Sequence, residues 1–470
     1  MSSPEGHQPS PGGDRPLVVV SNRGPVSFSL VDDEPVVRRG AGGLASGLGP
    51  LVRGTGALWV AAAMTDGDRA TAARGVVPAD GFDVRLLDID ARTWSLHYDS
   101  VCNEALWFAH HGLFDSVYSP TWPPGWVDSA WDAYRRVNVA FAEAVAGDAP
   151  RDAVVLIQDY HLCLMAEPLR RARPDLALVH FSHTPFATPA WLRMLPDVVR
   201  TELVDGLAAH HAVGFHTGRW VADFEACCAD LGIRPPATFA SPLAPDPDDL
   251  RATVESAACQ EAGRELDEII GDRAFVARVD RIELSKNILR GFDAFAALLE
   301  ADPSRHGKVV FGAFCYPSRQ GVADYDRYAT AVASRVGEIN ERFGTSDWTP
   351  IHYDPTDHYP RSVAALVRAD VVVVNPVRDG LNLVAKEAVV VNDRDGQLLL
   401  SPEAGAWPEL ATHAWRADPF DVGQTARAMA GALDATPGER RRRADGLRSA
   451  ATARTSADWL ADQLAAAPVR

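Results

Sequence analysis

Lysine is scarce in this chain of 470 residues: it occurs only at positions 286, 308 and 386, and arginine supplies the rest of the 46 basic residues. The 63 acidic residues outnumber them, so the formal net charge is −17. Binding to duplex nucleic acid or to an anionic membrane needs a surplus of cations that replaces counterions, so the composition argues against both as main partners. A small anionic ligand is compatible with this charge where cations cluster locally.

Cysteine is also rare, with six residues, and none of them forms a C-x-x-C pair. Their spacing indicates neither a disulfide framework nor a zinc site, and we predict no metal and no cofactor. The longest strongly apolar runs, such as residues 57–64, are far shorter than the roughly 18–20 residues that span a bilayer. Residues 1–15 are polar and lack the apolar core of a secretory signal, so we expect a disordered tail on a soluble, cytoplasmic protein.

Short apolar runs alternate with helical stretches along the rest of the chain. Strands are predicted at residues 17–21, 154–157, 178–182, 212–215, 275–278, 309–314, 371–374 and 398–401. Helices are predicted at 130–146, 162–171, 221–231, 289–300, 322–343 and 362–367. This alternation favours parallel sheets with helices on both faces. We therefore predict an α/β fold of two doubly wound Rossmann-like domains with a cleft between them.

A proline-rich stretch at residues 235–249 is predicted to be a linker, because proline cannot donate to a strand ladder. It divides the chain nearly in half. We expect one domain at residues 16–240, a second at 241–455, and a final helix at 456–470. Ligands of such domains bind at the carboxyl ends of the strands.

The strongest local signal is Asn-Pro-Val-Arg-Asp-Gly-Leu-Asn-Leu-Val-Ala-Lys-Glu at residues 375–387, directly after a predicted buried strand. Asp379 and Glu387 are eight positions apart, and a helix is predicted to begin near Asn382. The first N–H groups and the positive dipole end of that helix form an anion site. Two carboxylates around it suit a ligand with a phosphate in the middle and hydroxyl groups on both sides. The alternative is a capped helix with a solvated glutamate.

A second signal is the pair of cations Arg281 and Lys286, which follows the predicted strand 275–278. Two cations five positions apart on a loop can both point at one diphosphate and stabilise it as a leaving group. The alternative is a surface loop with a salt bridge to Asp280 or Glu283.

The first half of the chain carries weaker signals. Arg23 follows the first strand, and Gly42 and Gly43 belong to a loose dinucleotide fingerprint at residues 40–45, which leaves a nicotinamide oxidoreductase as a rival function. We interpret these glycines as a loop whose backbone approaches a phosphate or a sugar.

Two further strands each end at a polar residue, Asp159 on one and His183 on the other, a pair that can bind sugar hydroxyls or move protons, although a lone histidine is often structural. Tyr98 and Trp107 flank a predicted Cys-Asn-Glu loop and are candidates to face the cleft.

Together these motifs resemble the retaining trehalose-6-phosphate synthases, GT-B glycosyltransferases of a GT20-like family. The resemblance extends from about residue 17 to the last helix. It rests on residues 21–23, 41–44, 98–107, 159–161, 183–186, 214–215, 281–286, 317–319, 348–350 and 378–387. It implies that glucose moves from GDP- or UDP-glucose to glucose 6-phosphate with retention, which gives α,α-trehalose 6-phosphate. The implied mechanism is front-face attack, in which the departing phosphate oxygen takes the acceptor proton.

The resemblance also implies a role for each candidate. Residues 16–240 become the acceptor domain, 241–455 the nucleotide-sugar domain, and the last helix crosses back to the first domain. The predicted diphosphate clamp is Arg281 and Lys286. The donor glucose and ribose are assigned to Asp379, Gly380, Leu381, Asn382, Leu383 and Glu387, with Gly42 and Gly43 over the donor. The sugars and the acceptor phosphate are assigned to Asp159, His183, Arg23, Tyr98, Trp107 and Arg319, and we expect Arg319 to act separately from the clamp.

The chain departs from the family pattern at residues 60–64, where Ala62 replaces a tryptophan, at Gln158, which replaces a histidine, and at residues 242–245. The first departure leaves an alternative open: a pseudoglycosyltransferase that couples cyclitol units. A non-catalytic sugar-phosphate sensor is a further rival, but its clamp and carboxylates would be eroded, and here they are intact.

The donor base is predicted from the loop at residues 353–358. Asp357 can accept from the N1–H and amino group of guanine, so we expect GDP-glucose to rival or exceed UDP-glucose. The alternative is that Asp354 and Asp357 are solvated loop acids. A homo-oligomer is compatible with the sequence.

Overall fold

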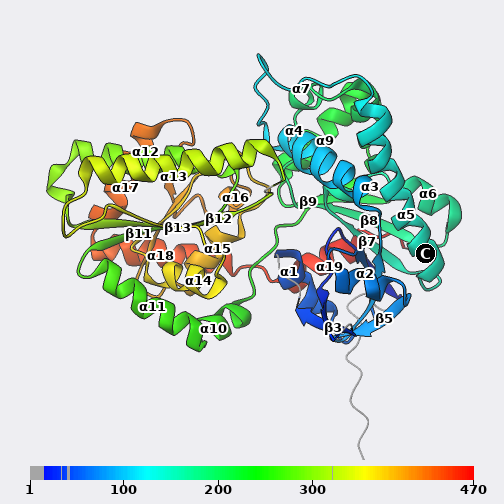
Figure 1. Ribbon diagram of the computed structural model, residues 1–470, viewed down its shortest axis with the longest axis horizontal. Coiled ribbons are helices and arrows are strands. Elements are labelled where there is room, and N and C mark those ends of the chain that lie inside the picture. Colours follow the sequence, from blue (N-terminus) through cyan, green and yellow to red (C-terminus); the bar gives the residue numbers. More distant parts are fainter. Residues whose placement is uncertain (1–14, 33, 40–42, 320, 470) are drawn as a thin grey trace, which may run out of the picture. The chain divides into compact units, whose positions relative to one another are not determined.

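The computed structural model describes residues 15–32, 34–39, 43–319 and 321–469, and it divides into two compact units (Figure 1). Unit 1 comprises Met1–Leu243 and Ser456–Arg470, and unit 2 comprises Ala244–Thr455. The predicted tail, apart from Arg15, and Gly42 lie outside the described residues. No described helix is both long and apolar enough to cross a membrane.

Unit 1 is built on an eight-stranded sheet with the order β10-β9-β8-β7-β1-β4-β6-β5. Only the β5–β6 pair is antiparallel. The strands are β1 (Leu17–Val20), β4 (Leu58–Ala62), β5 (Val76–Ala79), β6 (Phe82–Leu87), β7 (Val154–Gln158), β8 (Ala177–Ser182), β9 (Ala212–Phe215) and β10 (Ala237–Ala240). A separate antiparallel hairpin consists of β2 (Val26–Val31) and β3 (Glu34–Arg39). The order of strands along the chain reverses between β1 and β7.

Helices cover this sheet because its strands are apolar on both faces. Val18 and Val20 of β1 pack in one core with Phe141 of α5 and Leu169 of α6. On the opposite face, Phe181 of β8 meets Trp459 of α19 edge to face. The α-helices are α1 (Gly43–Val52), α2 (Asp66–Ala72), α3 (Ala91–Ser95), α4 (Trp107–His111), α5 (Asp132–Asp148), α6 (Ala166–Ala172), α7 (Pro189–Leu192), α8 (Asp197–Ala208), α9 (Gly218–Leu231) and α19 (Ser456–Ala465). The short segments are η1 (Leu96–Leu106) and η2 (Val127–Trp131), both π-helical, and η3 (Tyr160–Leu162), a 3-10 turn.

Unit 2 contains an all-parallel sheet with the order β13-β12-β11-β14-β15-β16. Its strands are β11 (Ala274–Ile282), β12 (Val309–Pro317), β13 (Ile351–Asp354), β14 (Val371–Val374), β15 (Gln397–Leu400) and β16 (Trp415–Arg416). Its helices are α10 (Pro247–Glu255), α11 (Ala257–Ile270), α12 (Ile288–Ala301), α13 (Ala323–Phe343), α14 (Tyr359–Arg368), α15 (Leu383–Val391), α16 (Trp407–Leu410), α17 (Val422–Asp434) and α18 (Pro437–Ala451), with short turns η4 (Leu284–Lys286) and η5 (Pro303–Arg305). The order reverses between β11 and β14.

Two cores lie on the two faces of this second sheet. Val371 and Val373 face a core with α12, α13 and α17, whereas Val372 and Val374 face a core with α11, α14, α15 and α18. Figure 1 shows α12, α13 and α17 on one side of the sheet and α10, α11, α14 and α18 on the other. The predicted α/β fold class, with parallel sheets between helices, is confirmed.

Two local predictions are wrong, and a third is incomplete. The chain passes from unit 1 to unit 2 between Leu243 and Ala244, inside the predicted linker, but this stretch also contains β10, which pairs with β9 as the edge strand of the first sheet, and the start of α10. Its prolines interrupt neither element, because Pro235 and Pro236 precede the strand and Pro247 is the first helical residue, where no N–H is needed. The supposed loop at residues 102–104 is part of η1. Strand β11 continues to Ile282, so Arg281 lies on the strand rather than on a loop after it.

Candidate active site

In both units some of the candidate residues lie at the carboxyl ends of the two strands between which the strand order reverses. In unit 1, Arg23 comes shortly after β1 and Asp159 comes directly after β7. In unit 2, Arg281 lies at the end of β11 and Asp379 follows β14. Open α/β sheets bind ligands outside the carboxyl ends of their strands at this point of reversal. The topology therefore places a candidate site on each unit.

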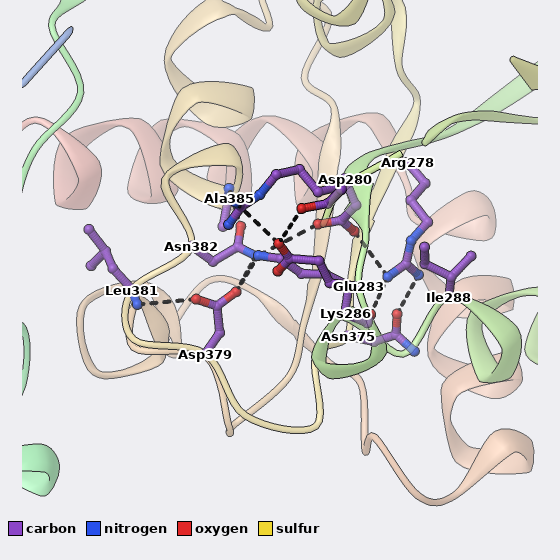
Figure 2. Close-up of polar contacts among 12 residues, drawn as sticks. Arg278, Asp280, Glu283, Lys286, Ile288, Asn375, Asp379, Leu381, Asn382 and Ala385 are labelled. Carbon is purple, nitrogen blue, oxygen red and sulfur yellow. Dashed lines mark hydrogen bonds and ion pairs between the residues drawn. The ribbon is translucent and has the colours of Figure 1, made fainter. Parts of the chain in front are cut away.

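The centre of the unit 2 site is an ion pair between the clamp lysine and the aspartate of the long motif (Figure 2). Lys286 Nζ lies 2.6 Å from Asp379 Oδ2 and 3.9 Å from Asp280 Oδ1. Burial alone would lower the pKa of Lys286, but the carboxylates of Asp379, Asp280 and Glu283 outweigh it and raise that pKa. The ammonium group is therefore charged, and Asp379 neutralises it before any phosphate binds.

A fully buried arginine, Arg278, lies beside this pair. Its guanidinium donates to Asn375 Oδ1 at 2.6 Å and to the backbone carbonyl of Lys286, and it lies 3.0 Å from Asp280 Oδ2. A Cβ on Gly291 would come within 2.6 Å of this guanidinium, so that position accepts only glycine without rearrangement. Sequence reasoning missed Arg278, and the available signal was a charged residue inside an apolar strand.

The second clamp residue shares a partner with Arg319. Glu283 is fully buried, and its Oε1 accepts from Arg319 Nη1 at 2.7 Å and lies 3.1 Å from Arg281 Nη1. Ser318 Oγ donates to the same oxygen at 3.0 Å. The Glu283 carboxylate therefore links Arg319 to the clamp, in contrast to the expectation of separate groups, and the separate binding role of Arg319 stays a prediction. The alternative of a salt bridge to Glu283 is also present in the structure.

The turn after β14 leads into α15 as predicted. Asn382 caps the helix by accepting from the N–H of Ala385 at 3.1 Å, and its Nδ2 donates to Asp379 Oδ2 at 3.1 Å. Leu381 donates its N–H to Asp379 Oδ1 at 3.4 Å. The turn is packed closely, because a Cβ on Gly405 would lie 1.9 Å from the carbonyl oxygen of Gly380. Leu383 begins the helix, and the first N–H groups of any helix have no partner within it.

Glu387 lies further along the same helix. Burial, together with the nearby carboxylate of Asp249, raises the pKa of Glu387 to about 7. Its neighbour Lys386 is fully buried and pairs with Glu409 Oε2 at 2.7 Å, so that lysine has a structural role within unit 2. The predicted pair of carboxylates in this motif thus consists of an ion-paired Asp379 and a Glu387 that titrates near neutrality.

Backbone conformation marks three of the candidates. Asp159, Arg319 and Asn382 have positive φ angles of 71°, 48° and 74°. This region is sparsely populated by residues other than glycine, and aspartate and asparagine tolerate it better than arginine does. Such conformations cluster at functional sites, so they support the assignment of these positions.

In unit 1, Arg23 and Tyr98 lie together. The exposed Arg23 donates from Nη2 to the Tyr98 hydroxyl at 3.4 Å. The Tyr98 ring stacks on Trp94 with centroids 5.4 Å apart and on His161 at 5.9 Å. Trp107 is buried on α4, where it stacks on His111 with centroids 3.9 Å apart, and its ring lies 5.8 Å from that of Tyr160. Its place in the acceptor pocket stays a prediction.

Asp159 and His183 also lie together. Asp159 Oδ1 accepts from the backbone N–H of His183 at 3.2 Å. His183 Nε2 lies 3.0 Å from Gln158 Oε1, and burial lowers the pKa of His183 to about 4, so its ring is neutral at neutral pH. Gly43 begins α1, and its neighbour Gly42 lies outside the described residues.

The loop at residues 353–358, which is proposed to contact the donor base, already makes contacts within the protein. Asp354 pairs with Arg361 and accepts from the N–H of Thr356 at 2.9 Å. Asp357 is exposed. Of these two acids, Asp357 is therefore the one positioned to take a new partner.

Comparison with known proteins adds independent evidence. The model of glycosyltransferase family 20 matches residues 15–467. A trehalose-6-phosphate synthase from Mycobacterium sp. (strain JLS) is 32% identical over 486 residues, with 97% of each chain covered. An E. coli structure bound with UDP-2-fluoro glucose has a TM-score of 0.83 at 26% identity and covers 95% of this chain and 98% of its own. A UDP-forming alpha,alpha-trehalose-phosphate synthase from Burkholderia xenovorans, in complex with glucose-6-phosphate, has a TM-score of 0.82 at 27% identity, with 95% and 98% covered.

Proposed function

This chain belongs to glycosyltransferase family 20, and on that premise we propose that it transfers glucose from a nucleotide-diphosphate glucose to glucose 6-phosphate, which yields α,α-trehalose 6-phosphate. It is a hexosyltransferase of trehalose biosynthesis, EC 2.4.1. The observation that carries the proposal is the cluster of Arg281, Lys286 and Asp379 at the strand-order reversal of unit 2. Coupling of cyclitol units is not favoured, because the related Burkholderia xenovorans enzyme binds glucose-6-phosphate.

The donor diphosphate is assigned to the two clamp cations. As the bond between C1 and the phosphate oxygen breaks, negative charge grows on that oxygen, and fixed cations stabilise it. The Arg281 side chain is 43% exposed and can reach a ligand while Glu283 orients it. Lys286 exchanges its ion pair with Asp379 for one with phosphate, which frees the Asp379 carboxylate to accept from glucose hydroxyls.

Helix α15 binds the remainder of the donor. The N–H groups of Leu383 and the residue after it belong to the first turn of α15, where the helix dipole favours an anion, and we assign them to the donor phosphate. Glu387, as a carboxylate, accepts from the ribose hydroxyls, and this binding favours its ionised form over the protonated form that burial favours.

The acceptor is assigned to unit 1. A phosphate dianion needs several charge-assisted donors when it leaves water, and Arg23 with the Tyr98 hydroxyl supplies two of them. Asp159 and neutral His183 bind sugar hydroxyls. Retention follows when the new bond to C1 forms on the face that the phosphate leaves and the acceptor proton passes to the departing phosphate oxygen. The products are a nucleoside diphosphate and the phosphorylated disaccharide.

Uracil is supported as the donor base by the UDP-forming relative and by the E. coli structure bound with UDP-2-fluoro glucose. Exposed Asp357 keeps guanine as a competing candidate. The reaction is assigned to the cytoplasm, since both substrates are small soluble anions.

The test is steady-state kinetics of the purified enzyme with UDP-, GDP- and ADP-glucose, each with glucose 6-phosphate, free glucose or a cyclitol phosphate. We expect turnover with glucose 6-phosphate and very poor turnover with free glucose. Turnover with the cyclitol phosphate alone would replace this proposal by the alternative.

A further inference from the structure

Two buried glutamines connect His183 to the last helix of the chain. Gln158, the final residue of β7, has its Oε1 3.0 Å from His183 Nε2. The Nε2 of Gln158 donates to Gln463 Oε1 at 3.0 Å, and Gln463 lies on α19. Both glutamine side chains are fully buried. Gln463 is 305 positions away from Gln158 along the chain, yet it contacts this partner of the candidate sugar-binding residue His183.

The direction of these hydrogen bonds determines which nitrogen of His183 carries the proton. An amide oxygen can only accept, so the imidazole must donate from Nε2. In the neutral ring Nδ1 then has a lone pair and accepts. The other hydrogen bond of His183 within the described part of the chain is its backbone N–H to Asp159. His183 is a partly exposed residue, and Nε2 is taken by Gln158, so Nδ1 is the nitrogen left for a ligand.

The other neighbours of the ring do not select a tautomer. The rings of Trp459, His216 and Phe181 have centroids 5.7, 5.2 and 5.2 Å from that of His183. The Asp159 carboxylate is occupied by the backbone N–H rather than by the ring. Burial keeps the ring neutral, but burial favours neither tautomer. The Gln158 amide is therefore the group that distinguishes Nε2–H from Nδ1–H.

We propose that Gln158 is a positioning residue that, oriented by Gln463, holds His183 as the Nε2–H tautomer and so presents Nδ1 as an acceptor to a hydroxyl group of the bound sugar. The role in sugar binding rests on the proposed function, whereas the tautomer is a property of the free protein. A glutamine does not titrate, so this arrangement holds one tautomer over the working pH range. A histidine, which the family pattern has at this position, can adopt either neutral tautomer and so would not fix the direction of the hydrogen bond.

The first measurement is a long-range ¹H–¹⁵N correlation spectrum of the full-length protein with ¹⁵N-labelled histidine, in which loss of one signal in His183→Gln identifies His183. We expect the Nε2–H pattern in the wild type and a mixture of tautomers in Gln158→Met, which has the same length without the hydrogen bonds. Gln463→Met should produce less of the second tautomer than Gln158→Met does, because the hydrogen bond between Gln158 and the His183 ring remains. An Nδ1–H pattern in the wild type, or an unchanged pattern in Gln158→Met, overturns the proposal.

The second measurement is the pH profile of kcat/KM for glucosyl transfer. We expect Gln158→Met to lower kcat/KM about 10-fold, the upper range for one net hydrogen bond. Gln158→Glu keeps the acceptor and adds a charge beside Nε2, so the acid limb should move up by about 1–3 pH units. The control is Gln397→Met, a buried glutamine of unit 2 outside the site. If Gln397→Met lowers kcat/KM as much as Gln158→Met does, or if the acid limb of the pH profile does not move in Gln158→Glu, then Gln158 has a merely structural role and the proposal is wrong. A wild type without transfer activity refutes the proposed function but leaves the tautomer test intact.

Discussion

The two cations of the clamp are expected to differ in what they contribute to stability. Lys286→Ala leaves Asp379, whose side chain is 14% exposed, without its cation at 2.6 Å. Breaking such a mostly buried pair from one side costs about 3–5 kcal/mol. Asn382 and the N–H of Leu381 still donate to that carboxylate, so we expect about 3 kcal/mol. Arg281→Ala removes a side chain that is 43% exposed, and Glu283 retains Arg319, so we expect about 0–1 kcal/mol.

Thermal unfolding and steady-state kinetics measure the two effects separately. For a unit of roughly 200 residues, 1 kcal/mol shifts Tm by about 2–4 °C, so Lys286→Ala should lower the Tm of unit 2 by about 6–12 °C. Arg281→Ala should lower it by less than about 4 °C. Both variants should lose about 10²–10³ in kcat, because each removes one donor to the charge that develops on the leaving phosphate.

The matched control is the double variant Lys286→Ala/Asp379→Ala. It removes both charges, so it should recover most of the stability and none of the activity. A Lys286→Ala variant as stable as the wild type would refute the argument from the buried pair. Near-wild-type turnover in both single variants would refute the assignment of the clamp.

Further consequences concern Arg319, Glu387 and the buried histidines. Arg319→Ala should weaken nucleotide binding as well as the use of glucose 6-phosphate, because Arg319 helps to hold the Glu283 carboxylate that also orients Arg281. An unchanged nucleotide Kd by calorimetry would contradict this. Donor KM should rise as pH falls below about 7, where Glu387 takes up a proton, and Glu387→Gln should abolish this dependence; a flat wild-type profile would exclude a carboxylate role. Burial lowers the pKa of His97 to about 3 and of His210 to about 4 from the ordinary 6.5. Their neutral forms stabilise unit 1 above pH 6.5, and this contribution is lost as pH falls, by about 3 kcal/mol each at pH 4. Urea midpoints that do not change between pH 7 and pH 4 would contradict this last expectation.

The predicted strands and helices were recognisable because parallel strands buried on both faces have continuous apolar runs. The runs at β7, β9 and β14 are of this kind. The hairpin of β2 and β3 was missed because its residues are mostly exposed or half-buried and carry no such run. Strand β10 was missed because its flanking prolines resemble a linker, and an edge strand tolerates prolines just outside its ladder.

The individual residues of the site could be predicted from the sequence, but the contacts between them could not. Both Lys286 and Asp379 follow apolar strands, which is visible in the sequence. Their contact depends on β11 lying beside β14, and strand order is set by packing between distant segments. The same holds for Arg281 and Arg319, which share the Glu283 carboxylate because β11 and β12 are neighbours. The helical surroundings of Trp107 were not predicted, because η1 mixes polar residues with apolar ones and has no clear apolar period.

The most direct test of the central claim is the structure of the product formed from UDP-glucose and glucose 6-phosphate. NMR of the purified product should show a 1,1-linkage with both anomeric carbons in the α configuration and a phosphate on one C6. Nucleoside diphosphate should appear in equal amount. A β anomer at the transferred glucose, free glucose as the main product, or no transfer to glucose 6-phosphate with any nucleotide-glucose donor would contradict the account.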